Sequence, residues 1–229
     1  MWTERIKSRC ADVLLNNKLE GDYFFNRASV CDCPDPVKAA GQIAKIFWEK
    51  GLDCYLYDRD DKLAGKGFAQ IDTMHVLVAS STSPNSGTKV VQIDRALLPL
   101  WIDVFCRSFG ASEWKGEVER IMNSSFDGLE LLLSYHDEVP AGCAALYTKK
   151  SVTGLYCLST VSKLRRRGLA NDMLAATLRL SNNLFLQTFG SEGLLPFYEK
   201  AGFTLAYTKN IYVLRDATKL KSLKNYAVK

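Results

Sequence analysis

One stretch of the chain, residues 152–203, constrains its fold more than any other. It holds an apolar strand pattern, a basic turn with one glycine, a helical pattern, a second apolar strand pattern and a helical pattern ending in Gly-Phe. A helix that begins directly after such a turn presents free backbone N–H groups, and its dipole favours an anion at that end. The order of these patterns therefore predicts a strand–turn–helix unit that can hold a phosphate.

The rest of the chain from residue 90 onward alternates between strand and helix patterns. Strands are expected at residues 90–93, 129–134, 141–147, 155–161 and 184–188, with one or two more in 203–214. Helices are expected at residues 97–109, 117–122, 168–180 and 194–200. The turn residues of YHDEVPAG predict a hairpin between the second and third strands. A hairpin followed by alternating strands and helices predicts a mixed α/β sheet.

Small polar residues at 80–89, SSTSPNSGTK, predict a linker between an N-terminal part, residues 1–79, and a larger domain, residues 90–229. The N-terminal part has a helix pattern at 37–50 and a strand pattern at 53–57. Its last segment, GFAQIDTMHVLV, shares Gly, Phe, Thr and the final Val with GFTLAYTKNIYV, at a constant offset of 135 residues. If this repeat is real, the N-terminal part is a shortened copy of the end of the C-terminal fold. It has no basic glycine turn of its own.

Composition limits the classes of partner. A net charge of +5 suits an anionic small ligand but is too small to indicate nucleic acid. No apolar run is long enough to span a bilayer, and the N-terminus lacks the apolar core of a signal peptide. A cytoplasmic location without membrane attachment is expected. The seven scattered cysteines are expected to be reduced core thiols. Cys31 and Cys33 have no matching second pair or nearby histidine, so no metal site is expected.

The basic turn reads RRRGLA. With the strand before it and the helix after it, it resembles motif A of the GNAT N-acetyltransferase superfamily, a strand followed by (R or Q)-x-x-G-x-(G or A) and a helix. Arg165, Gly168 and Ala170 match the pattern, while Ser162 replaces the usual proline after the strand. Residues 184–203, LFLQTFGSEGLLPFYEKAGF, resemble motif B of the same superfamily. The resemblance covers roughly residues 90–214 and implies the GNAT fold. The N-terminal part resembles the degenerate half-domain of some two-part members, with less specificity.

The resemblance implies acetyl-CoA as co-substrate. Backbone amides of residues 166–170 would bind its pyrophosphate, with Arg165 or Arg167 adding charge. Residues 158–161 would pair with the pantetheine arm, and one of their N–H groups would hold the oxyanion. Tyr198 would either donate a proton to the leaving thiolate or serve only as an aromatic residue that packs in the core. The expected donor-binding residues are Leu158, Ser159, Thr160, Val161, Arg165, Arg166, Arg167, Gly168, Leu169, Ala170 and Gln187. Gln187 and Thr188 either line the cleft or are merely polar strand ends.

The general base and the acceptor pocket stay open. Many superfamily members carry a glutamate on the strand before the phosphate turn, yet residues 152–161 contain no carboxylate. Five residues could act as the base through a water molecule, or could be ordinary surface charges. They are His136, Asp137, Glu138, Glu113 and Glu117. His75 is expected to be a structural histidine. The aromatic residues Trp101, Phe105 and Phe109 either line the acceptor pocket or pack in the core. Trp114 is expected at the surface.

These observations predict an N-acetyltransferase that transfers an acetyl group from acetyl-CoA to a primary amine by direct attack in a ternary complex. The acceptor is not identified, and either a monomer or a homodimer is compatible. Because the strand lacks a carboxylate, the alternative is a catalytically weak or inactive acyl-CoA-binding regulatory module. RNA binding through the basic turn and tail is disfavoured, since no exposed aromatics are interleaved with the basic residues.

Overall fold

The computed structural model describes residues 3–30, 34–79, 89–181 and 183–214. The chain forms two compact units. Unit 1 contains Met1–His75, Phe189–Gly193 and Tyr207–Lys229, and unit 2 contains Val76–Thr188 and Leu194–Ala206. The two units therefore interleave along the sequence, rather than meeting at a single boundary near residue 80. The expected linker, except for Lys89, lies outside the described residues.

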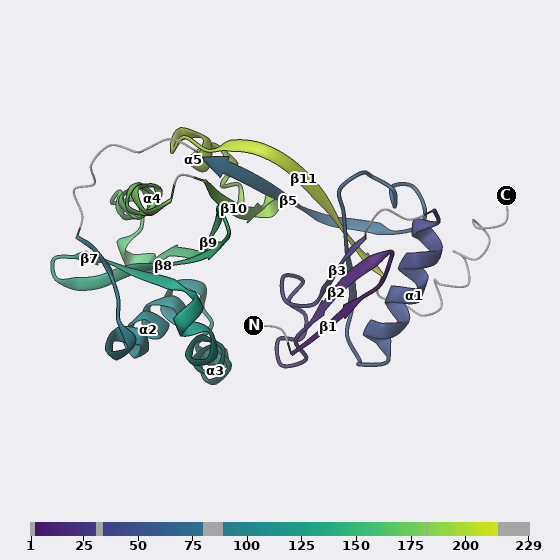
Figure 1. Ribbon diagram of the computed structural model, residues 1–229, viewed down its shortest axis with the longest axis horizontal. Helices are drawn as coiled ribbons and strands as arrows, with labels where there is room; N and C mark the ends of the chain where they lie inside the picture. Colours follow the sequence, from purple (N-terminus) through teal and green to yellow (C-terminus); the bar gives the residue numbers. More distant parts are fainter. Residues whose placement is uncertain (1–2, 31–33, 80–88, 182, 215–229) are drawn as a thin grey trace. The chain divides into compact units, whose positions relative to one another are not determined.

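In unit 1 a sheet is covered on one face by a helix (Figure 1). Its strand order is β1-β2-β3-β4-β11. The strands are β1 Glu4–Lys7, β2 Ala11–Leu15, β3 Arg27–Val30, β4 Cys54–Asp58 and β11 Thr204–Leu214, whose residues from Tyr207 onward belong to this unit. Helix α1, Pro36–Trp48, joins the parallel strands β3 and β4 and buries Phe47 against Leu56 and Tyr212. The helix starts there because the Asp35 side chain accepts the Lys38 N–H at 2.9 Å. The first three strands were not predicted from the sequence.

In unit 2 a mixed sheet has helices on both faces, which confirms the predicted α/β class. Its strand order is β5-β10-β9-β8-β7-β6. The strands are β6 Val90–Gln92, β7 Glu130–His136, β8 Val139–Lys149, β9 Val152–Thr160 and β10 Leu184–Phe189, together with the end of β5. Strand β5 spans Ala69–Ala79, of which Ala69–His75 belong to unit 1 and Val76–Ala79 to unit 2. Helices α2 Leu98–Phe109 and α3 Lys115–Ser125 pack on one face; α4 Leu169–Leu180 and α5 Leu195–Lys200 pack on the other. Single 3-10 turns occupy Arg95–Leu97, Ser112–Trp114, Phe126–Gly128, Ser162–Leu164 and Gly190–Glu192.

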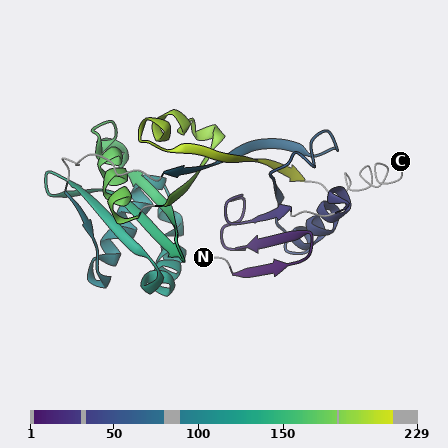
Figure 2. The same ribbon diagram turned by 45° about the horizontal axis from the view of Figure 1, so that its top comes forward.

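Strands β5 and β11 lie side by side in both views (Figures 1 and 2). Each has 11 residues, and both ends are offset by the same 135 residues as the sequence repeat. Strand β5 follows β4 in the chain but pairs with β10, whereas β11 follows β10 but pairs with β4. Each half of the sequence thus supplies the strand that extends the other half's sheet.

Several predicted features have a simple structural outcome. Cys54, Cys106 and Cys143 are buried and Cys157 is half-buried, all as free thiols. Cys31, Cys33 and the basic tail, residues 215–229, lie outside the described residues. Within the described ranges, no three His, Cys, Asp or Glu side chains gather as metal ligands would. None of the helices in the described part of the chain combines the length and apolar character that a membrane span requires.

Candidate active site

The first element of the site is the point where β9 and β10 stop pairing. Their parallel ladder joins Thr153–Leu155 to Leu184–Leu186. In the described residues it goes no further, although β9 continues to Thr160 and β10 to Phe189. Ligands of open α/β sheets bind beyond the carboxyl ends of such strands. The predicted donor-binding residues Leu158, Ser159 and Thr160 lie on the part of β9 that still runs beside β8 but no longer pairs with β10.

The second element is a β-bulge on the same length of β9. Cys143 pairs with Ser159 and Ala145 with Tyr156, so both Cys157 and Leu158 stand opposite Ala144. Cys157 takes a left-handed backbone conformation with φ of 57°. Two residues facing one make a strand bend and interrupt its ladder. The bulge therefore changes the direction in which β9 presents its N–H and carbonyl groups just after its pairing with β10 ends.

The third element is the turn between β9 and α4. The Val161 N–H donates a hydrogen bond of 2.8 Å to the carbonyl of Ala141 in β8. Arg166 and Gly168 both have positive φ, 64° and 83°. Gly168 stands directly before the first helical residue, and a Cβ there would meet no protein atom within 4 Å. Left-handed residues beside a helix N-terminus turn successive N–H groups outward into a concave anion site.

The three arginines of the turn are all exposed but have different surroundings. Arg165 donates from Nε to the Thr160 carbonyl at 3.1 Å and from Nη2 to the Ser108 carbonyl at 3.0 Å, which ties the turn to the end of α2. Arg167 Nη1 donates a hydrogen bond of 2.8 Å to Nε2 of His136. Among the described residues, the Arg166 side chain forms no ion pair. Arg166 is therefore the guanidinium of the three that is free to approach an anion.

Tyr198 lies on α5 and is only 7% exposed. Its ring packs against Phe197, with centroids 5.1 Å apart, and against Phe203 at 6.0 Å. It belongs to the hydrophobic cluster that includes Met173 of α4, and Leu158 of β9 packs against the same cluster. The structure thus brings Tyr198 and the bulged part of β9 onto one cluster. On β10, Gln187 is exposed and Thr188 is buried.

The residues considered as a general base, and His75, lie on several different elements. Glu117 forms a two-pronged ion pair with Arg120, at 2.8 and 2.6 Å. Asp137 and Glu138 form the exposed tip of the β7–β8 hairpin, and Glu113 is exposed. His75 accepts or donates one hydrogen bond, Nδ1 to Thr208 Oγ1, at 3.1 Å.

The α2 aromatics divide between core and surface. Trp101 is fully buried with Phe105 stacked on it at 5.6 Å, while Phe109 is 51% exposed and Trp114 half-buried. Trp101 and Phe105 are therefore core residues. Sequence reasoning missed the β-bulge and the hydrogen bond that Trp101 makes to β8, because neither has a signal in hydrophobic periodicity.

No protein-family model matches the sequence, and a search of curated protein sequences finds no match either. Solved structures do match. A functionally unknown conserved protein from Staphylococcus epidermidis has a TM-score of 0.71 at 14% identity, with 94% of each chain covered. A GCN5-related N-acetyltransferase from Sphaerobacter thermophilus has a TM-score of 0.70 at 13% identity, covering 90% of this chain and 76% of that one. The chain has the GNAT fold.

A further GCN5-related N-acetyltransferase, from Kribbella flavida, agrees with this fold at a TM-score of 0.64 and 17% identity, covering 92% of this chain and 88% of that one. This is the fold that the resemblance of the RRRGLA and LPFYEKAGF segments implied. At these identities the likeness concerns the fold alone. Which individual residues bind acetyl-CoA stays a prediction.

Proposed function

We propose that this GNAT-fold protein is an acetyl-CoA-dependent N-acetyltransferase that acts on a primary amine. The observation that carries the proposal is the end of the β9–β10 ladder at Leu155 and Leu186, immediately before the bulge at Cys157 and Leu158. An extended amide chain such as pantetheine can pair with a strand edge in place of a neighbouring strand. The part of β9 beyond Leu155 no longer pairs with β10 and offers such an edge.

The donor is expected to bind along β9 and end at the turn. Its pantetheine amides pair with Leu158, Ser159 and Thr160, and its pyrophosphate meets the N–H groups of residues 166–170. The positive φ of Arg166 and Gly168 and the uncapped start of α4 support this placement. Val161, Leu169 and Ala170 act through their backbone, because Val161 and Leu169 have buried side chains.

The chemistry follows from this placement. The neutral amine nitrogen attacks the thioester carbonyl carbon, and an N–H of the bulged strand stabilises the oxyanion. The C–N bond forms, the C–S bond breaks, and Tyr198 donates its hydroxyl proton to the leaving thiolate. The nitrogen loses a proton to solvent as the amide forms, and solvent returns a proton to Tyr198. The ammonium proton of the acceptor is removed by solvent or by a side chain reached through water. Holding both substrates in one complex supplies much of the rate.

Calorimetric binding of acetyl-CoA to the full chain tests the donor site. Arg166→Gln should weaken binding about tenfold, because it removes one charge beside the pyrophosphate. Arg179→Gln, at the far end of α4, removes the same charge and should leave the affinity unchanged. No binding by the wild-type chain, or equal binding by both variants, would overturn the donor site.

Release of the CoA thiol with a panel of primary amines tests catalysis. Tyr198→Phe should lower kcat by roughly 10²-fold or more with little change in the KM for acetyl-CoA. An unchanged kcat in this variant would remove the proton-donor role of Tyr198.

A second candidate is an acyl-CoA-binding module without turnover. The observation that favours it is the absence of any aspartate or glutamate on β9, residues 152–160. Tight acetyl-CoA binding combined with no thiol release for any amine would support this module and reject the transferase. Steady thiol release would reject the module.

A further inference from the structure

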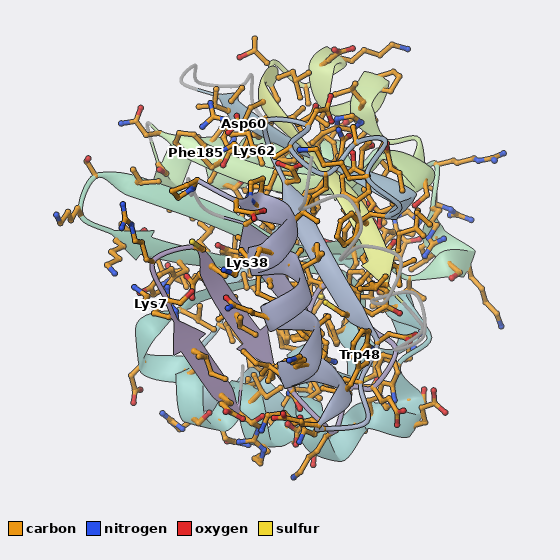
Figure 3. The ribbon with its side chains drawn as sticks, turned by 90° about the vertical axis from the view of Figure 1, so that its right-hand side faces the viewer. Lys7, Lys38, Trp48, Asp60, Lys62 and Phe185 are labelled. Carbon is orange, nitrogen blue, oxygen red and sulfur yellow. The ribbon has the colours of Figure 1, made fainter. Side chains whose placement is uncertain are left out.

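Three aromatic side chains lie side by side across the sheet of unit 2. They are Tyr147 of β8, Tyr156 of β9 and Phe185 of β10 (Figure 3), and we call them the aromatic row. Gly154 pairs with Tyr147 on one side and with Phe185 on the other. A Cβ at Gly154 would lie 2.6 Å from Cε2 of Tyr156, so the Tyr156 ring lies over this glycine. Paired residues share one face of a sheet, and the three rings are therefore neighbours.

The aromatic row lies on the face of the sheet against which α2 packs. Tyr156 packs against the hydrophobic cluster that contains Trp101 of α2. Leu184 and Leu186 belong instead to the cluster that contains α4 residues. Because side chains alternate along a strand, Phe185 between these two leucines points to the α2 side. The register and the packing thus place the row on the same face.

The aromatic row borders the proposed position of the acetyl group. The ladder between β9 and β10 ends at Leu155 and Leu186, so Tyr156 is the first residue of β9 beyond it. Cys157, in the bulge, follows directly and packs against the same α2 cluster. Tyr156 and Phe185 are only half-buried, and their rings keep surface that a ligand can contact. An acceptor that approaches the bulge from the α2 side therefore meets these two rings.

The strands that carry the row supply no proton acceptor. None of the residues of β8, β9 and β10 is an aspartate, a glutamate or a histidine. Burial raises the pKa of Cys157 to about 12 and also raises the pKa of Cys143, so both thiols stay protonated at neutral pH. The carboxylates of α2, α3 and the 3-10 turn between them are exposed or ion-paired: Asp103, Glu113, Glu117 and Glu119.

This environment favours one class of amine. An alkylamine is an ammonium ion at neutral pH, and it must lose a proton before it can attack a thioester. Its charge is also costly to move onto an apolar surface that offers no carboxylate. An amine attached directly to an aromatic ring is uncharged at neutral pH, because its lone pair is delocalised into the ring. The ring itself can stack on, or meet edge to face, the rings of the protein.

We propose that the acceptor is an aromatic primary amine whose ring packs against Tyr156 and Phe185. This inference rests on the proposed acetyl transfer and names its acceptor class. The amine lone pair attacks the thioester carbonyl carbon, the C–N bond forms and the C–S bond breaks. The nitrogen gives one proton to solvent, and the CoA thiolate receives one from Tyr198, which solvent then reprotonates. The products are an aryl amide and the CoA thiol.

Thiol release by the full chain with acetyl-CoA and three amines tests the acceptor class. Aniline and cyclohexylamine share a six-carbon ring, whereas benzylamine keeps the aromatic ring but is an ammonium ion at neutral pH. At neutral pH, kcat/KM for aniline should exceed the values for both other amines at least about tenfold. It should not change as the pH is raised through neutrality, whereas kcat/KM for benzylamine should rise as this amine loses its proton.

The outcomes separate this inference from the proposed function. Equal or higher kcat/KM for cyclohexylamine would overturn packing of the acceptor ring on the aromatic row. Equal or higher kcat/KM for benzylamine at neutral pH would show that the site removes a proton, and would overturn the preference for an uncharged amine. Acetyl-CoA binding without thiol release for any amine would reject the transferase itself, and this acceptor with it.

Substitutions of Phe185 test the ring contact. Phe185→Leu should raise the KM for aniline about tenfold and leave the KM for acetyl-CoA unchanged. Phe185→Tyr keeps the ring and should retain the wild-type KM, which separates loss of the ring from general damage to β10. Phe126→Leu, the same change at a half-buried phenylalanine in the turn after α3, should also behave as the wild type. Equal KM values for aniline in Phe185→Leu and Phe126→Leu would overturn the contact.

Discussion

Trp101 Nε1 donates a hydrogen bond of 3.1 Å to the carbonyl of Ala144, the residue that stands opposite the β9 bulge. A bulge interrupts the regular ladder, and a buried carbonyl needs another donor where the ladder is interrupted. Trp101 is fully buried on α2, so the helix stabilises the strands at the position where β9 changes direction. The shape of the candidate site therefore depends on a residue that lies in the core.

Trp101→Phe should destabilise the protein by roughly 2–4 kcal/mol, because it leaves a cavity and a buried carbonyl without its donor. Urea unfolding measures this. Trp114→Phe, at a half-buried tryptophan in the following 3-10 turn, should have a much smaller effect. Equal losses in the two variants would contradict the role given to the Trp101–Ala144 bond.

Gly142→Ala should disturb β8 beside the bulge. A Cβ at this position would lie 2.5 Å from the Ser159 carbonyl oxygen and 2.8 Å from Ser134 Oγ, so the backbone of β9 must move. We expect a loss of roughly 1–3 kcal/mol in urea unfolding and weaker acetyl-CoA binding. Gly116→Ala in α3 meets no atom within 4 Å and should stabilise the helix by up to about 1 kcal/mol. Full acetyl-CoA affinity in Gly142→Ala would argue against donor pairing at Ser159.

Arg165→Lys tests how the phosphate turn is held. A single ammonium cannot reproduce the two directed bonds to the Thr160 and Ser108 carbonyls, although the charge is kept. The midpoint of thermal unfolding should fall, with a stability loss of about 1 kcal/mol, and acetyl-CoA affinity should fall with it. Arg166→Gln should lower the affinity without lowering the midpoint. The reverse pattern would show that Arg165 binds the ligand and does not brace the turn.

Asp72→Asn should destabilise unit 1 at neutral pH. Burial raises the pKa of Asp72, but hydrogen bonds from Ser191, Thr73 and Tyr23 outweigh burial and hold this pKa below its usual value. The stability from the carboxylate is present above its unfolded pKa and is lost as the pH falls. Urea unfolding should show a loss of about 1–3 kcal/mol at neutral pH and a smaller difference in acid. A difference that does not change with pH would contradict this assignment.

Alkaline unfolding should report on Tyr23. Burial, followed by the bond to Asp72, raises its pKa from 10.0 to about 12. The folded chain therefore keeps this proton longer than the unfolded chain, and stability is lost as the pH rises between these two values. Tyr23→Phe should flatten this part of the curve of unfolding free energy against pH. Lys209 acts with the opposite sign, because its pKa is lowered in the fold. Parallel wild-type and Tyr23→Phe curves would refute the assignment.

Local patterns predicted the parts of the fold that are strongly periodic. The helices expected at residues 168–180 and 97–109 are α4 and α2, and the hairpin at YHDEVPAG turns at Asp137 and Glu138. Strands β1 to β3 were missed because they have only four or five residues each, which is too short for a periodic pattern to stand out. Such strands are stabilised by their neighbours in the sheet rather than by their own pattern.

The sequence by itself determined the strand–turn–helix from β9 to α4 and the position of Gly168 in the turn. These features follow from residues close together in the chain. Only the tertiary structure decided that β5 pairs with β10 and β11 with β4, and that the β9–β10 ladder ends at Leu155. Strand pairing joins residues far apart in sequence, and burial across the whole sheet selects the register, so local periodicity carries no record of either.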